Sequence, residues 1–292
     1  MAQISYLLFD VFAERPFQGN QLAVVPQHLD DATMQTLANE LNVAETVFLH
    51  RTDDVKRPAE LRIFTPRHEM PFAGHPTVGA TYAIAEVLEW VPPETEAFAL
   101  GERVGDVAVR LQRRDGKLFA WLRTPPVTFE QHLDRARAAA SLGLNQEDLH
   151  ATLPSQIAGA GNPFLFIPLK DRESVDRAWY AAGGFDQSIE SHVSGVFVFC
   201  STVQGTYARM FAPMSGIAED PATGSATGPL YAYLTKHGAL DPERTSFVSE
   251  QGVKLGRRSV LHVHMARYRI GDAPEFDVGG ATIFVGEGSF RI

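Results

Sequence analysis

The sequence is poor in cysteine and has no long apolar runs. Cys200 is the single cysteine among 292 residues, so an internal disulfide is excluded. This usage fits a reducing compartment, and we expect a cytoplasmic protein. No apolar run approaches the ~20 residues that a membrane-spanning helix needs. The first residues include Asp10, Glu14 and Arg15, which do not fit a secretory signal.

Basic segments and cofactor motifs are also scarce. The formal net charge is −9 and the longest basic block is Arg257-Arg258, which argues against nucleic acid and anionic membranes as partners. A small anionic substrate remains compatible, because local dipoles at a site matter more than net charge. Gly286-Glu-Gly288 has no helix after it, and no P-loop occurs. His262 and His264 share a strand face but lack a third ligand, so the sequence predicts no metal or cofactor.

What the sequence does contain is an internal repeat. Four segments of the first half recur in the same order in the second half, at offsets of 142 to 150 residues. The pairs are Gly19-Asn20 with Gly161-Asn162, Glu45-Thr-Val-Phe-Leu49 with Ser194-Gly-Val-Phe-Val198, Arg62-Ile-Phe-Thr-Pro66 with Arg209-Met-Phe-Ala-Pro213, and Glu69-Met-Pro-Phe-Ala-Gly-His-Pro-Thr77 with Glu219-Asp-Pro-Ala-Thr-Gly-Ser-Ala-Thr227. We interpret them as tandem copies of one supersecondary unit, each with a glycine turn that opens a helix.

The repeat and the chain length together predict two lobes. We expect an N-terminal lobe at 1–124, a C-terminal lobe at 125–280, and a closing strand at 281–292 that can return to the first lobe. Helix Val78–Trp90 is apolar on nearly all faces and should be buried, with a counterpart at Ala226–His237. The predicted class is α+β, in which each lobe is a curved, mostly antiparallel sheet around a central helix. With the two copies facing each other, both helix N-termini would meet at a shared cleft.

Such helix N-termini can bind an anion. The first amides of a helix have no intrahelical partner, and the helix dipole adds partial positive charge. Gly74 and Gly224 let the backbone approach a ligand closely. Favourable cases of this effect reach ~2 kcal/mol per helix end. The simpler alternative is that both glycines serve helix entry alone; the matched pair favours a carboxylate site.

Three ionisable residues lie on or beside the repeated turns: Glu45, His75 and Asp220. Glu45 lies among apolar residues, so it is either exposed on its strand or turned toward the cleft. In the cleft, desolvation would raise its pKa and suit it to take and return a proton. His75 could instead be a helix cap and Asp220 a turn residue. Their places on matched elements favour the functional interpretation.

These motifs resemble those of the PhzF-type phenazine-biosynthesis isomerase family, which has a diaminopimelate epimerase-like fold. The segments that carry the resemblance are Pro16-Phe-Gln-Gly-Asn20, Ala44-Glu-Thr46, Arg62-Ile-Phe-Thr-Pro66, Pro71-Phe-Ala-Gly-His-Pro-Thr77 and Glu219-Asp-Pro-Ala-Thr-Gly-Ser-Ala226. The resemblance implies a homodimer that catalyses cofactor-independent isomerisation, as of trans-2,3-dihydro-3-hydroxyanthranilate.

The resemblance also implies roles for individual residues. Glu45 would be the general acid/base that moves a proton between carbons, and His75 and Asp220 would orient the substrate and assist. Backbone amides around Gly74, His75, Gly224 and Ser225 would hold its carboxylate, and Asn20 would join the substrate-binding residues.

Two departures from the family pattern matter. Gln21 stands where the family usually has proline, so the shape of the first turn is not fixed by the resemblance. Related racemases use a cysteine in each matched loop, where this chain has His75 and Ser225. A two-thiol racemase is therefore not expected.

Two other functions stay open. Ser225, His75 and Asp220 include the residue types of a serine hydrolase triad, but the serine does not lie in a G-x-S-x-G elbow. A non-catalytic small-carboxylate binding protein would need no acid/base, so the presence of Glu45 argues against it. The sequence favours an isomerase acting on a small carboxylate.

Overall fold

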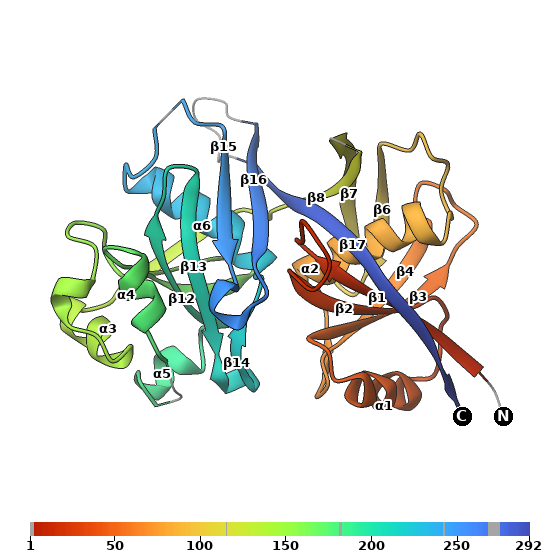
Figure 1. The fold of residues 1–292 in the computed structure, drawn as a ribbon, viewed down its shortest axis with the longest axis horizontal. Coiled ribbons are helices and arrows are strands. Elements are labelled where there is room, and N and C mark those ends of the chain that lie inside the picture. Colours follow the sequence, from red (N-terminus) through yellow and green to blue (C-terminus); the bar gives the residue numbers. More distant parts are fainter. Residues whose placement is uncertain (1–2, 115, 181–182, 242, 268–274) are drawn as a thin grey trace. The chain divides into compact units, whose positions relative to one another are not determined.

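The computed structural model describes residues 3–114, 116–180, 183–241, 243–267 and 275–292. The chain divides into two units (Figure 1), of which unit 1 contains Met1–Arg123 and Gly279–Ile292 and unit 2 contains Thr124–Val278. These divisions lie one and two residues before the predicted ones at 124/125 and 280/281. Unit 1 is thus built from two separate parts of the chain.

The strands of unit 1 form a closed ring. Pairing runs β1–β2–β3–β4–β6–β7–β8, and β17 pairs with both β8 and β1. Two of these pairings, β2–β3 and β4–β6, are parallel. The strands are β1 (Gln3–Val11), β2 (Asn20–Val25), β3 (Glu45–Arg51), β4 (Ala59–Phe64), β5 (Glu69–Met70), β6 (Ala97–Glu102), β7 (Gly105–Arg114), β8 (Lys117–Arg123) and β17 (Glu275–Arg291).

In the sequence, Asp30 or Asp31 predicts the cap of a helix with an apolar stripe at Met34, Leu37, Ala38 and Leu41, and helix α1 (Asp31–Leu41) begins there. Asp30 is the N-cap, and its Oδ1 accepts a hydrogen bond from the Thr33 amide at 3.1 Å. The buried face of α1 carries Met34, Leu37 and Ala38, which belong to the same apolar cluster as aromatic residues of β3 and β4. Its amphipathic spacing therefore accounts for its place on the outside of the sheet.

Helix α2 (Gly74–Tyr82) is buried along almost its whole length and contacts β1, β2, β3 and β8. The predicted helix, Val78–Trp90, was wrong in its first residue and in being α-helical throughout. The helix starts at Gly74, and a π-helical segment, η1 (Ala83–Val87), continues it. There Leu88 donates to the carbonyl of Ala83 rather than to the residue four before it. No residue type in this apolar stretch signals that change.

Unit 2 has the same kind of architecture with more surface helices. The sequence predicts a helix from Arg172 to Ala181; helix α4 begins at Arg172 but ends at Arg177, and Ala181 lies outside the described residues. Its elements are β9 (Thr128–His132), α3 (Arg135–Ser141), η2 (Gln146–Asp148), β10 (Gln156–Ala160), β11 (Asn162–Pro168), α4 (Arg172–Arg177), α5 (Gln187–Glu190), β12 (Gly195–Ser201), β13 (Gly205–Ala212), η3 (Pro213–Ser215), β14 (Ile217–Asp220), α6 (Gly224–Lys236), β15 (Ser246–Gln251), η4 (Val253–Leu255) and β16 (Ser259–Arg267).

The strand pairings of unit 2 follow those of unit 1 in order and direction. β11–β12 is parallel as β2–β3 is, β12–β13 is antiparallel as β3–β4 is, and β13–β15 is parallel as β4–β6 is. A short hairpin, β4–β5 or β13–β14, precedes the buried helix in each case. α6 packs its Leu230, Tyr231 and Tyr233 into an apolar cluster that includes Phe166 and Phe199.

Candidate functional site

Glu45 is the first residue of β3, and the parallel register sets it opposite Leu22 of β2. Its side chain is 12% exposed. The sequence left two positions open for this carboxyl, on the solvent face of the strand or turned inward. Burial to this degree matches the inward alternative.

His75 is the second residue of α2, and its side chain is 6% exposed. Its Nε2 lies 3.2 Å from Oε2 of Glu45, and both atoms are shielded from solvent. On the other side of the ring, Nδ1 lies 3.5 Å from Nδ2 of Asn20. Asn20 begins β2 and is 1% exposed. Unit 1 thus brings together three of the predicted site residues, Asn20, Glu45 and His75.

The imidazole of His75 is neutral at ordinary pH. Burial lowers its pKa to about 3, while a hydrogen bond with the backbone of Gln21 acts in the opposite direction. An ion pair between His75 and Glu45 would bury two charged groups, and the loss of their hydration makes this strongly unfavourable. The structure thus places a neutral ring nitrogen 3.2 Å from a carboxyl oxygen in a buried site.

The N-terminus of α2 adds backbone donors to the same place. Ala73 is the N-cap in an extended conformation, and no side chain caps the helix. Gly74 and His75 follow as the first two helical residues. Their amides belong to the group of donors that a helix leaves without intrahelical partners. The chain therefore sets a buried carboxyl and an imidazole next to a helix N-terminus within one unit.

Unit 2 contains the remaining predicted residues around the start of α6. Asp220 ends β14, and its Oδ2 accepts a hydrogen bond of 2.6 Å from the hydroxyl of Thr223. Gln251 donates to the carbonyl oxygen of Asp220 at 2.7 Å and to Oγ1 of Thr223 at 3.0 Å. Gly224 and Ser225 open α6 and are partly buried.

Sequence reasoning missed Thr223 and Gln251, which hold the turn before α6. Gln251 is fully buried, and its Oε1 also accepts from the Thr223 amide at 3.2 Å. The repeated sequence segments end before β6 and β15, so the position of Gln251 shows only in the structure, where β15 pairs in parallel with β13 as β6 pairs with β4.

A second matched feature lies just before each helix. Arg62 of β4 binds Glu69 of β5, with Nη2 to Oε2 at 2.9 Å, and Arg209 of β13 binds Glu219 of β14 with the same atoms at 2.8 Å. Each arginine also uses Nε, so both pairs are bidentate. These pairs fix the hairpins that lead into α2 and α6.

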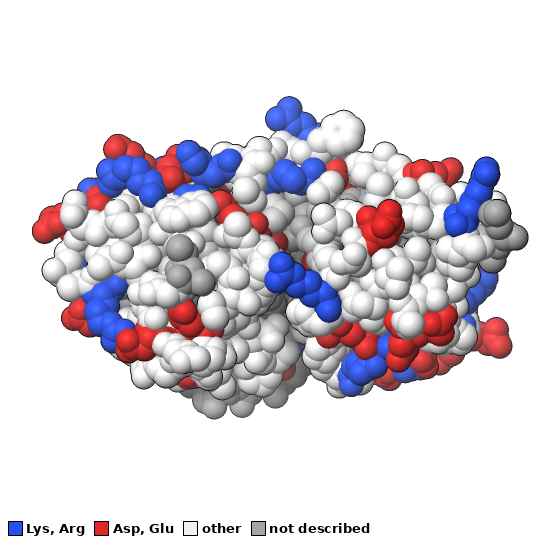
Figure 2. Space-filling model, turned by 90° about the horizontal axis from the view of Figure 1, so that it is seen from below, with Lys and Arg blue, Asp and Glu red and all other residues white. Residues whose placement is uncertain are grey.

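Surface and charge features set further bounds. Acidic and basic side chains are interspersed over the face that Figure 2 shows. In the part of the chain that the structure describes, no group of three His, Cys, Asp or Glu side chains could hold a metal ion. Among the same residues, no helix is both long and apolar enough to cross a membrane.

Comparison with known proteins identifies the relatives of this chain. It is 34% identical, over 88% of each chain, to a trans-2,3-dihydro-3-hydroxyanthranilate isomerase of Pseudomonas aeruginosa. It is 33% identical, over 99% of each chain, to an uncharacterized isomerase of Mesorhizobium japonicum. These relatives support an isomerase.

Solved structures agree on the fold. A PhzF-family phenazine biosynthesis protein of Bacillus anthracis covers the whole of both chains with a TM-score of 0.89 at 23% identity. A predicted epimerase of Pseudomonas aeruginosa gives a TM-score of 0.81 at 31% identity over 99% of each chain. The family model for phenazine biosynthesis-like proteins (PhzC-PhzF) matches residues 9–288. The chain therefore belongs to the PhzC-PhzF family of phenazine biosynthesis-like proteins.

Proposed function

We propose that this protein is a cofactor-independent isomerase that moves a proton between two carbons of a small carboxylate. The observation that carries the proposal is the buried approach of Glu45 Oε2 to His75 Nε2, 3.2 Å apart, at the N-terminus of α2. A carboxyl placed against a neutral imidazole can take a proton and return it, and positioned acid/bases of this kind contribute ~10²–10⁴-fold in rate.

In the proposed reaction Glu45 removes a proton from one carbon of the substrate. The electron pair left behind shifts along the adjacent double bond, and Glu45 returns the proton to a second carbon. The proton removed is the proton supplied, so neither an oxidant nor a reductant is consumed. His75 stays neutral and orients the Glu45 carboxyl through Nε2, while Asn20 and the Gln21 backbone fix the ring.

Substrate binding is proposed for the helix N-termini. Gly74 and His75 in unit 1, and Gly224 and Ser225 in unit 2, offer backbone amides suited to a carboxylate. Asp220 is proposed to orient the substrate and assist the transfer. That both sets of residues serve one substrate, and that the protein is a homodimer, stay predictions.

The name of the Pseudomonas aeruginosa relative supplies the first compound to test. Incubation with trans-2,3-dihydro-3-hydroxyanthranilate in heavy water should give an isomer that carries solvent deuterium at a carbon. If that compound does not react, a metabolite extract can be screened for carboxylates that gain deuterium only when the protein is present. Absence of deuterium from every bound carboxylate would favour a non-catalytic binding protein.

A variant of Glu45 tests its role. Glu45→Gln keeps the size and hydrogen-bonding capacity of the side chain but cannot exchange a proton, so turnover should fall by at least ~10²-fold. Ligand affinity, measured by calorimetry, should change little. Glu40→Gln, the same change on the exposed face of α1, is the matched control. Turnover that survives Glu45→Gln would refute the assignment.

A serine hydrolase is the less favoured alternative. His75 lies beside Glu45 and Asn20, and Asp220 accepts a hydrogen bond from Thr223. An acylating reagent that labelled Ser225, with loss of labelling in Ser225→Ala, would support the hydrolase over the isomerase.

A further inference from the structure

Thr77, in the first turn of α2, makes two hydrogen bonds with one hydroxyl group. Its Oγ1 lies 2.8 Å from the carbonyl oxygen of Ala73 and 2.7 Å from Oε1 of Glu102. A hydroxyl has a single hydrogen to donate, and a carbonyl oxygen can only accept. Both contacts are therefore hydrogen bonds only if Glu102 is protonated and donates to Thr77, which in turn donates to Ala73.

The surroundings of Glu102 support the same protonation state. The residue is 9% exposed, and its Oε2 is buried without a hydrogen-bond partner among the described residues. A buried oxygen without a partner costs much less on a neutral acid than on a carboxylate. Burial raises the pKa of Glu102 to about 7, although the Thr77 hydroxyl acts to lower it.

In unit 2, the position that corresponds to Glu102 holds a residue that does not titrate, Gln251. In unit 1 Ala59 of β4 pairs with Leu100 of β6, and in unit 2 Thr206 of β13 pairs in the same way with Ser249 of β15. Two residues further along each second strand lie Glu102 and Gln251, which therefore occupy matching positions. Both residues are buried; Glu102 binds Thr77 in the first turn of α2, and Gln251 binds Thr223, the N-cap residue of α6. Gln251 binds Thr223 through an amide, and Thr227 donates its hydroxyl to the Thr223 carbonyl at 2.9 Å. The strand end thus binds the start of the central helix in each unit, through an amide at the N-cap residue in unit 2 and through an acid at the first turn in unit 1.

We propose that the proton on Glu102 holds the first turn of α2, so that Glu102 is a positioning residue for Gly74 and His75 whose effect depends on pH. Ionised Glu102 would draw the Thr77 hydrogen to itself and leave the Ala73 carbonyl with only the Thr77 amide, at 3.3 Å. Ala73 is the N-cap residue directly before Gly74 and His75. Loss of its bond to the hydroxyl loosens the turn that carries the proposed binding amides.

The charged groups on the neighbouring elements are engaged with one another. Burial and Thr77 are what set the pKa of Glu102, with no contribution from a neighbouring charge. His75 on α2 is neutral, because burial lowers its pKa. The remaining pairs are Arg57 with Glu60 and Asp106, Arg62 with Asp31 and Glu69, and Arg103 with Glu69. Glu45 on β3 also reaches this turn, through His75 Nε2 at 3.2 Å, whereas Glu102 reaches it through the Thr77 hydroxyl. The Glu102→Gln and Thr77→Val variants separate the two, because both leave Glu45 in place.

The first test needs no activity, so its result is separate from that of the proposed function. Amide chemical shifts of Gly74 and His75 are followed by NMR from pH 5 to 9. In the wild type they should titrate with a midpoint near 7, and in Glu102→Gln, which places the amide of unit 2 in unit 1, they should not. Glu60→Gln, the same change on an exposed residue of β4, should titrate as the wild type does.

The second test rests on the proposed function. The rate of deuterium exchange into a substrate should fall as the pH rises through about 7 in the wild type and in Glu60→Gln. In Glu102→Gln this fall should be absent while substrate affinity below pH 6 is kept. Thr77→Val, which removes the link between Glu102 and Ala73, should also abolish the titration of the Gly74 and His75 amides. Amides that titrate in Glu102→Gln as in the wild type, or that do not titrate in the wild type, would overturn the proposal.

Discussion

At the scale of single residues, the arrangement around His75 combines short-range and long-range information. The sequence placed His75 in the glycine turn before a helix that begins at Val78, whereas in the structure the helix begins earlier and His75 is its second residue. Its neighbours Asn20 and Glu45 come from β2 and β3, strands that a parallel register holds side by side. The sequence could name all three residues from the repeat and the resemblance. It could not give the 3.2 Å approach of Glu45, which depends on strand register and on the burial of α2.

Burial of neutral His75 predicts a specific pH dependence of stability. Its pKa is about 3 in the folded protein and 6.5 in an exposed chain, so below pH 6.5 the unfolded state binds a proton that the folded state does not. Stability therefore falls on acidification through this window. Relative to His75→Asn, the wild type should lose about 2 kcal/mol of unfolding free energy between pH 6.5 and 5.

Chemical denaturation at each pH measures this difference. His192→Asn, a change at a half-exposed histidine of unit 2, controls for the loss of any imidazole. Parallel pH profiles for wild type and His75→Asn would show that folding does not lower the pKa of His75, contrary to the buried neutral ring.

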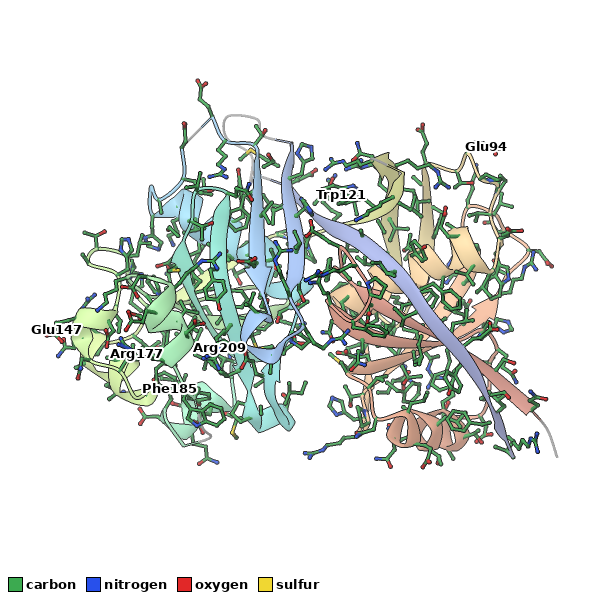
Figure 3. All side chains as sticks on the ribbon, viewed as in Figure 1. Glu94, Trp121, Glu147, Arg177, Phe185 and Arg209 are labelled. Atoms are coloured by element: carbon green, nitrogen blue, oxygen red, sulfur yellow. The ribbon has the colours of Figure 1, made fainter. Side chains whose placement is uncertain are left out.

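At the scale of elements, the matched arginine–glutamate pairs differ in burial. Arg209 and Glu219 have side chains 6% and 7% exposed, against 20% and 16% for Arg62 and Glu69. Arg209 (Figure 3) also donates to three carbonyl groups at the end of α4, including that of Ala178 at 2.6 Å. Arg62 has a second carboxylate, Asp31, at 3.0 Å. Arg62 therefore keeps a counter-ion if Glu69 is neutralised, but Arg209 loses its bidentate carboxylate if Glu219 is.

This difference predicts unequal costs for the same substitution. Glu219→Gln leaves a buried guanidinium without its bidentate carboxylate and should destabilise the protein by about 3 kcal/mol. Glu69→Gln should cost about 1 kcal/mol, because Arg62 keeps Asp31 and is partly exposed. Each value is read from denaturant unfolding of the single variants. Equal costs for the two variants would show that burial does not decide the strength of these pairs.

The elements also show where prediction from sequence stops. The cap at Asp30 and the apolar spacing of Met34, Leu37 and Ala38 sufficed to place α1, because both signals are local. The π-helical segment after Tyr82 and the short strand β5 were not foreseen. The first lies in a mostly apolar stretch, where no residue marks the change of hydrogen-bond spacing. The second has only two residues and exists because the Arg62–Glu69 pair and the pairing with β4 hold it.

At the scale of the whole molecule, unit 1 depends on a strand from the far end of the chain. Strand β17 pairs with β1 from Val11 opposite Thr282 to Gln3 opposite Arg291. Phe284 and Phe290 of this strand contact Phe9 and Tyr6, with ring centroids 5.4 Å and 5.2 Å apart. The closing strand expected from the sequence, 281–292, corresponds to much of this segment. The sequence did not indicate that β17 begins at Glu275 and also pairs with β8, because such long-range pairing leaves no local pattern.

This closure predicts that the two units respond differently to truncation after Val278. Removal of 279–292 exposes the edges of β1 and β8 and uncovers Phe9 and Tyr6, so unit 1 should lose most of its stability. Unit 2 is continuous in sequence from Thr124 to Val278 and should keep its fold. Hydrogen exchange should then show fast exchange of β1 amides and continued protection of β12 and β13.

A peptide of residues 279–292, added in trans, controls for general misfolding, because it can restore the missing strand. Its addition should recover protection in β1, whereas the same peptide with Phe284 and Phe290 changed to serine should not, since it keeps the backbone donors but loses the ring contacts with Phe9 and Tyr6. Protection of β1 that survives the truncation would mean that unit 1 folds from Met1–Arg123 alone, and that β17 only covers an edge. Loss of protection in both units together would mean that the chain folds as one cooperative body, so that the repeat marks matched architecture but not separable stability.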